Sequence, residues 1–155
     1  MNSKARILIV DDEPNNISLM SNVFAEDYHI SVAISGEQAL NLLAKPHDIE
    51  LILLDVMMPQ MDGFEVFNRL RNNPATANIP VVFVTARTDI ESESLGLKAG
   101  AVDYIHKPIQ VGIARIRVRQ QLELSRQRLQ LQQLLRERTL EQKRLSNIIE
   151  STRSG

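Results

Sequence analysis

The sequence contains no cysteine and no tryptophan, and it has only four Phe and two Tyr among 155 residues. Without cysteine the chain can form no disulfide, no thiolate nucleophile and no thiolate metal site, and it has no need of an oxidising compartment. We therefore expect a cytoplasmic protein. With so few aromatic residues, its core must be built from aliphatic side chains.

Long apolar runs are also missing. The first apolar run, Ile7–Val10, is followed at once by acidic residues and is too short for a signal peptide or a membrane span. No other segment is long enough, so we expect no membrane partner. The composition, 43% hydrophobic and 24% charged, is that of an ordinary globular protein. A chain of this length accommodates one domain and an appendage.

The charges divide the chain into two parts. Residues 1–110 hold 8 Lys and Arg against 15 Asp and Glu, whereas residues 111–155 hold 10 against 4. No proline or glycine interrupts the stretch from Ile113 to Ile149, which is rich in good helix formers. We predict a globular domain over residues 1–122 and a helical segment over residues 123–155.

Five short aliphatic runs alternate with stretches of helical spacing. The runs are Ile7–Val10, Ile30–Ala33, Leu51–Leu54, Val81–Val84 and Val102–Ile105. Helices are predicted to begin near Pro14, to be capped by Ser35, to follow Asp62-Gly63, to cover Ile90–Ala99, and to form the C-terminal segment. This alternation predicts an α/β fold with a parallel, doubly wound sheet and a long C-terminal helix.

Polar residues follow the predicted strands. Asp11 and Asp12 follow the first strand, Asp55 the third, Thr85 the fourth and Lys107 the fifth. The carboxyl ends of parallel strands form one edge of a sheet, so these groups should converge there. Neighbouring carboxylates repel one another unless a cation is present. Hard oxygen ligands favour Mg²⁺, or Mn²⁺ in its place, over zinc.

The site that results is typical of phosphoryl transfer, with Asp55 as the expected nucleophile. The segments that carry this chemistry are Ile7–Pro14, Leu53–Gly63, Val84–Ala86 and Lys107-Pro108. In order and spacing they resemble the motifs of the bacterial response-regulator receiver family over roughly residues 4–122. The resemblance implies a flavodoxin-like, five-stranded sheet of strand order 2-1-3-4-5.

The resemblance also implies a role for each matching residue. Asp12 would bind Mg²⁺ directly, Asp11 would assist through water, and the backbone carbonyl of Met57 would supply a further ligand. Asp55 would accept the phosphoryl group from a sensor histidine kinase or a phosphotransfer protein. Lys107 would pair with the acyl phosphate, and the Lys107-Pro108 peptide bond would be cis.

Two further residues would report the phosphorylated state. The resemblance implies that Thr85 turns inward to hydrogen-bond the phosphoryl group and that Tyr104 follows as an aromatic switch. Met57 and Arg87, each two residues beyond a site residue, would flank the path of an attacking water. We expect them to slow hydrolysis and so to set the lifetime of the phosphorylated state. Met57, Met58 and Met61 are otherwise expected to fill the core.

Taken singly, each of these residues has a structural explanation. Asp11 and Asp12 could cap a helix, Thr85 could be an ordinary strand-end residue, Lys107 a solvated lysine and Tyr104 a static core residue. An aspartyl phosphatase of the haloacid-dehalogenase type would have a second Asp where this chain has Met57. Acidic residues after the first strand disfavour a phosphate-cradling, flavodoxin-like cofactor site. A receiver-like protein that signals without phosphorylation remains a third alternative.

The basic C-terminal helix, from Ile113 to Ile149, would be about 55 Å long at 1.5 Å per residue. We expect its start to pack on the sheet through Ile113, Ile116 and Val118, and its remainder to form either a parallel dimeric coiled coil or a merely amphipathic helix. A homodimer through this helix, or through the face of the fourth and fifth helices, is predicted. Because the arginines are spread around the helix, no direct nucleic-acid binding is expected. The segment resembles signalling helices that lead to an output domain, of PAS or cyclic-di-GMP enzyme type.

Overall fold

The computed structural model describes residues 4–86 and 103–153, and the chain divides into two compact units, residues 1–122 and 123–155. The predicted fourth helix, Ile90–Ala99, and Arg87 lie outside the described residues. Within the described residues, no helix combines the length and the apolar character needed to cross a membrane.

A five-stranded parallel sheet of order β2-β1-β3-β4-β5 forms the centre of the first unit, as predicted. The strands are β1 (Arg6–Val10), β2 (His29–Ala33), β3 (Ile49–Asp55), β4 (Val81–Ala86) and β5 (Asp103–Lys107). The central strand β3 is buried over nearly its whole length, because helices cover both of its faces.

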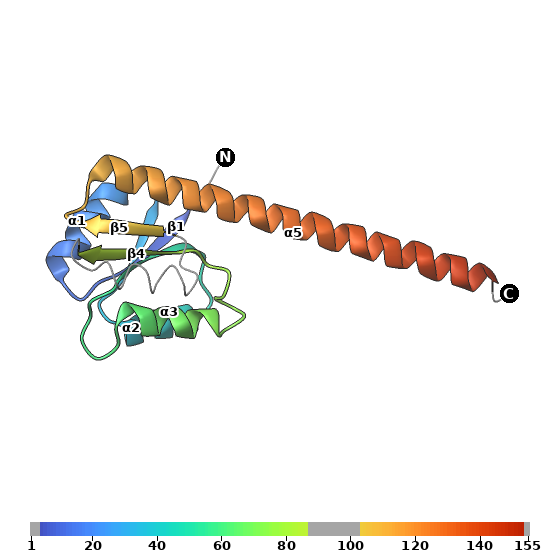
Figure 1. Cartoon of the computed structure of the whole chain (residues 1–155), viewed down its shortest axis with the longest axis horizontal. Coiled ribbons are helices and arrows are strands. Elements are labelled where there is room, and N and C mark those ends of the chain that lie inside the picture. The colour runs from blue at the N-terminus through green and yellow to red at the C-terminus, as the bar shows by residue number, and fades with distance from the viewer. Residues whose placement is uncertain (1–3, 87–102, 154–155) are drawn as a thin grey trace. The chain divides into compact units, whose positions relative to one another are not determined.

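Helices lie on both sides of this sheet. They are α1 (Pro14–Phe24), α2 (Gly36–Leu43), α3 (Gly63–Arg71) and α5 (Val111–Arg153). Within the first unit, α2 and α3 cover one face, and α1 and the beginning of α5 cover the other (Figure 1). The sheet is therefore doubly wound, as the alternating pattern predicted.

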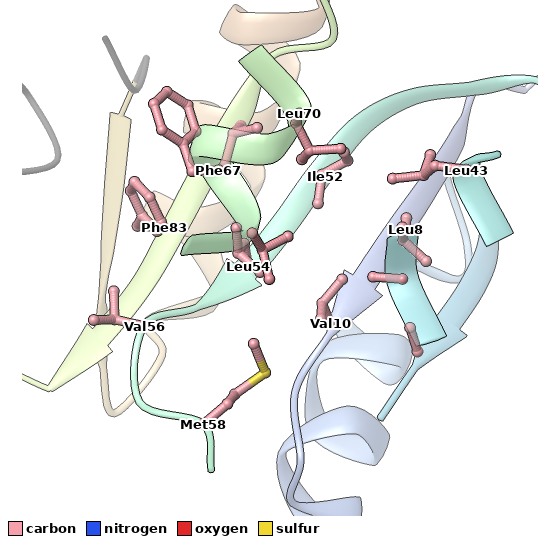
Figure 2. Packing of buried hydrophobic residues seen from close by; sticks show 14 of the residues in the cluster. Leu8, Val10, Leu43, Ile52, Leu54, Val56, Met58, Phe67, Leu70 and Phe83 are labelled. Carbon is pink, nitrogen blue, oxygen red and sulfur yellow. The ribbon is translucent and has the colours of Figure 1, made fainter. Parts of the chain in front are cut away.

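Two aliphatic clusters form the core, one on each face of the sheet. The cluster beneath α2 and α3 joins strand residues such as Leu8 and Leu54 to Phe67 and Leu70 of α3 (Figure 2). The opposite cluster joins β1, β3 and β4 to α1 and to the first turns of α5. Because side chains alternate between the two faces along each strand, the continuous apolar runs supply both clusters at once.

The helix starts follow from local sequence. Ser35 caps α2 through its Oγ, which accepts a hydrogen bond from the Gln38 N–H at 3.1 Å. The Gln38 side chain reaches back and accepts from the Ile34 N–H at 2.6 Å, which completes a reciprocal cap. Pro14 occupies the first turn of α1, where no N–H is needed.

The face of α5 that packs on the sheet differs from our expectation. Val118 is fully buried, as predicted, but Ile113 and Ile116 are 47% and 50% exposed. The residues that accompany Val118 into the core are Ala114 and Leu122, at spacings of four. The prediction was wrong for the two isoleucines because both faces of this helix carry apolar residues, so that periodicity alone did not identify the buried one.

Candidate phosphoacceptor and metal site

The strand register brings the predicted acidic residues to one edge of the sheet. Asp11 directly follows β1, and Asp55 is the last residue of β3. The two strands pair with each other, and Val10 of β1 lies beside Leu54 of β3. On the other side of β3, Asp55 pairs with Val84 of β4. The carboxylates therefore reach the same edge because their strands end at the same level.

Three carboxylates form a group that could hold a metal ion. Asp11, Asp12 and Asp55 each offer an oxygen, and these oxygens lie within 4.8 Å of one another. Asp11 is fully buried, Asp55 is 4% exposed and Asp12 is partly exposed. Oxygen donors at this density suit a hard divalent cation, which retains several waters and takes one or two carboxylates. The donor set thus fits the predicted kind of ion.

Lys107 lies between two of these carboxylates. Its Nζ is 3.4 Å from Asp11 Oδ2 and 3.3 Å from Asp55 Oδ1, and the side chain donates to both. The peptide bond from Lys107 to Pro108 is cis, the isomer that the resemblance implies. One ammonium among three carboxylates leaves the site with an excess of negative charge, which a divalent cation would offset.

Burial and charge shift the pKa values in this site. Burial raises the pKa of Asp55 to about 6, with a further contribution from the charge of Asp11 and an opposing one from Lys107. Burial lowers the pKa of Lys107, but the charges and hydrogen bonds of Asp55 and Asp11 outweigh it and raise that pKa above its usual 10.5. Lys107 therefore stays cationic at neutral pH, and Asp55 is a comparatively basic carboxylate.

The backbone of the loop after β3 contacts the Asp55 side chain. The Met57 N–H donates to Asp55 Oδ1 at 3.3 Å, and the Gly63 N–H donates to the Val56 carbonyl at 2.9 Å. Gln60 takes a positive φ of 67° in this loop. A Cβ on Gly63 would lie 2.4 Å from the Asp55 carbonyl oxygen, so only glycine permits this approach. From the sequence, Gly63 was expected only beside the start of a helix, and its close approach to the Asp55 carbonyl was missed.

The methionines of this loop have different environments. Met58 is 9% exposed and Met61 packs partly against the core, as expected of core residues. Met57 is 69% exposed, so the expectation that it fills the core was wrong. Met57 lies two residues beyond Asp55 in the sequence, and its role in setting the lifetime of the phosphorylated state stays a prediction. The companion residue in that hypothesis, Arg87, lies outside the described residues.

The two predicted switch residues occupy neighbouring strands. Thr85 is 1% exposed on β4, and its hydroxyl makes a long hydrogen bond of 3.4 Å to the Ala86 carbonyl. Tyr104 on β5 is 2% exposed, with its ring centroid 5.5 Å from that of Phe83. The Tyr104 carbonyl also accepts a hydrogen bond from Arg117 of α5. In this structure, Tyr104 is therefore packed inside the first unit.

Comparisons with known sequences match this arrangement. Residues 7–119 match the response regulator receiver domain family. A probable cyclic di-GMP phosphodiesterase of Vibrio cholerae is 46% identical over 124 residues, which cover 80% of this chain and 28% of that protein. The response regulator PleD of Caulobacter vibrioides is 45% identical over 106 residues, covering 68% of this chain and 23% of PleD. The chain thus spans less than a third of the length of these curated relatives.

Solved structures show the same fold. The crystal structure of a putative response regulator from Chloroflexus aurantiacus superposes with a TM-score of 0.74 at 32% identity, covering 78% of this chain and 99% of that one. The receiver domain of a Francisella response regulator superposes with a TM-score of 0.71 at 29% identity, covering 79% and 99%. In both cases nearly the whole of the other chain is matched.

Proposed function

The chain belongs to the response regulator receiver domain family, whose standard role is regulatory phosphoryl acceptance, and we propose that Asp55 is its phosphoacceptor. One observation supports this assignment above the others. Asp55 ends the central strand with its carboxylate between the Lys107 ammonium, at 3.3 Å, and two further carboxylates, and its pKa is raised to about 6. A buried, comparatively basic carboxylate beside a cation is a suitable nucleophile for a phosphoryl group.

In the proposed reaction, a carboxylate oxygen of Asp55 forms a bond to phosphorus as the phosphorus–nitrogen bond of a phosphohistidine breaks. The electron pair of that bond returns to the imidazole of the donor. Lys107 keeps its proton and pairs with the phosphoryl oxygens, so that it exchanges a carboxylate partner for a phosphoryl one. Phosphoryl acceptance on Asp55 then needs no proton transfer from the chain.

We propose Mg²⁺, or Mn²⁺ in its place, as the cation of this site. Asp12 and Asp55 would hold it directly, Asp11 would act through water, and the Met57 carbonyl would complete the protein's share of the ligands. When bound, the ion supplies positive charge against the phosphoryl oxygens and the three carboxylates. The oxygen-only donor set is what supports this proposal.

The proposed response involves Thr85 and Tyr104. The Thr85 hydroxyl has only a long hydrogen bond to lose, at 3.4 Å, and can turn to donate to a phosphoryl oxygen instead. Tyr104 lies on the neighbouring strand β5, and its ring packs against Phe83 of β4. A movement of β4 would therefore displace the Tyr104 ring. The two-state element is thus the β4–β5 edge, which a new doubly charged group would bias.

The partners are proposed from the relatives. A sensor histidine kinase or a phosphotransfer protein would supply the phosphoryl group. The regulated module would be of cyclic di-GMP enzyme type or a PAS domain, and the 46% identity to a protein named a probable cyclic di-GMP phosphodiesterase favours the first. A homodimer through the C-terminal helix, or through the face of the fourth and fifth helices, would transmit the change.

Acetyl phosphate with Mg²⁺ tests the phosphoacceptor. The intact chain should gain one phosphoryl group by mass, and Asp55→Asn should gain none. Asp27→Asn, which removes an exposed carboxylate, is the matched control and should be labelled like the parent. Labelling that persists in Asp55→Asn would mean that another residue is the acceptor.

A further inference from the structure

The helix of the second unit carries a stripe of exposed apolar side chains. Seven of them are between 51% and 62% exposed: Leu124, Leu131, Leu134, Leu135, Leu145, Ile148 and Ile149. In the part of the chain that the structure describes, nothing covers them. Two further leucines, Leu129 and Leu140, are exposed on other sides of the helix and do not fit the spacing of this stripe.

The stripe has the spacing of a coiled-coil seam. Leu124, Leu131 and Leu145 fall on one seven-residue series, whose remaining member between them is Arg138. Leu134 and Ile148 follow that series at intervals of three, so the two sets alternate as the a and d positions of a heptad. The other two d positions are polar, Gln127 and Glu141. Leu129 and Leu140 fall on f and c positions, which face away from a seam.

We propose that this stripe, Leu124 to Ile149, binds the same stripe of a second copy of the chain in a parallel, in-register coiled coil with Arg138 at the central a position. The inference rests on the proposed homodimer and specifies its alignment. A self-complementary seam suits an identical partner, because each a and d residue then meets its own counterpart.

The charges that flank the seam favour this alignment. In a parallel pair, each g residue lies near the e residue five positions later in the other helix, which places Glu123 beside Arg128 of the second copy. Arg138 at its a position lies beside the g residue Glu137 of the other copy. Within the described residues no hydrogen bond or ion pair engages the Arg138 side chain, so the guanidinium is available for that contact.

A neighbouring alignment would have as many apolar seam residues but a less favourable set of charges. If the seam shifted by one residue, Leu135 and Ile149 would replace Leu134 and Ile148 on the axis. Arg128 would then join Arg138 in the seam, so that two layers would each bring like charges together and the seam would hold no acidic residue. The charged residues of the proposed seam, Arg138 and Glu141, are of opposite sign, which favours this register, while the polar residues Gln127, Arg138 and Glu141 cost some stability.

Disulfide trapping distinguishes the two alignments, because the chain has no cysteine of its own. Four variants of the full chain would be oxidised: Leu134→Cys, Leu135→Cys, Ile148→Cys and Ile149→Cys. Cysteines at d positions of a parallel pair meet their counterparts, whereas those at e positions lie on opposite sides of the seam. Leu134→Cys and Ile148→Cys should therefore form covalent dimers at least 5-fold faster than their immediate neighbours.

Faster trapping of Leu135→Cys and Ile149→Cys would overturn the proposed register while leaving a homodimer in place. Trapping at position 134 but not at 148 would indicate an antiparallel pair and would also overturn it. A chain that light scattering shows to be monomeric at all concentrations would remove both the helix homodimer and the register, but not the assignment of Asp55.

The role of Arg138 has its own readout. Arg138→Leu should replace a charged layer of the seam with an apolar one and lower the dimer dissociation constant at least 10-fold by sedimentation equilibrium. Arg136→Leu, at an f position that faces away from the seam, is the matched control and should leave the constant unchanged. Equal effects of the two substitutions would contradict the placement of Arg138 on the seam.

Discussion

The Lys107 ammonium lies 3.3 Å from Asp55 Oδ1, although 52 residues separate the two in the sequence. The same ammonium is 3.4 Å from Asp11 Oδ2. Sheet order explains the meeting, since β1, β3, β4 and β5 are consecutive neighbours and all end at one edge. Charge of both signs is thereby concentrated around a single buried carboxylate.

Ionised Asp55 should cost stability in the absence of metal. Its pKa is about 6 in the folded chain against 3.8 for a free side chain, so between these pH values the folded state binds more protons than the unfolded state. Stability therefore falls as pH rises from about 4 to 6 and stays low above it. Asp55→Asn removes this loss and should gain on the order of 1–3 kcal/mol at pH 7, after allowance for water in the site.

The measurement is urea unfolding at pH 4, 5, 6 and 7 in the presence of a chelator. The advantage of Asp55→Asn over the parent should grow with pH across this range. Asp27→Asn, at an exposed position, should show no such growth. An advantage that is constant or shrinks with pH would mean that burial does not raise the pKa of Asp55.

Any side chain at position 63 should destabilise the fold for a steric reason. The missing Cβ of Gly63 leaves room for the Asp55 carbonyl oxygen, which would otherwise lie at 2.4 Å. Gly63→Ala should therefore destabilise the fold by about 1–3 kcal/mol and slow phosphorylation by acetyl phosphate. The matched control is Gly112→Ala in the first turn of α5, where an added Cβ meets nothing within 4 Å. That change should be neutral or stabilising by up to about 1 kcal/mol.

Chemical denaturation of the two alanine variants provides the comparison. A Gly63→Ala variant as stable as Gly112→Ala would show that the loop after β3 moves aside easily, and that the Asp55 backbone is not fixed by this contact.

Much of this fold could be predicted from the sequence, because the strands contain short aliphatic runs and helices α1 and α2 have recognisable start signals. The cap at Ser35 and the proline at the start of α1 depend only on neighbouring residues, so both could be predicted without knowledge of the tertiary structure. The site could be predicted because it depends on strand ends, and the strand order brings those ends together.

Other features were not accessible from the sequence because they depend on tertiary packing. The choice between Ile113 and Ala114 as the buried side of α5 depends on where the helix meets the sheet. The exposure of Met57 depends on the course of a loop in which Gln60, and not a glycine, takes positive φ. The need for glycine at position 63 depends on a backbone approach that no sequence pattern records.

Met57 should affect how long the phosphorylated state lasts. Its side chain is 69% exposed beside Asp55, where a thioether offers little hydrogen bonding to an attacking water. Met57→Asn would supply an amide that can orient such a water, so dephosphorylation should be several-fold faster. Met57→Leu keeps the apolar character and should leave the rate near that of the parent. The decay of the phosphorylated chain, followed by intact mass after acetyl phosphate is removed, gives the rates, and equal rates for all three proteins would contradict this role.

The most direct test of the account is to identify the phosphorylated residue chemically. Borohydride reduces an aspartyl phosphate to homoserine, which peptide mass spectrometry can locate in the chain. After treatment with acetyl phosphate and Mg²⁺, homoserine should be found at position 55 and at no other aspartate. Homoserine at position 11 or 12, or phosphate retained on a histidine or a hydroxyl side chain, would contradict the assignment of Asp55 as the acceptor.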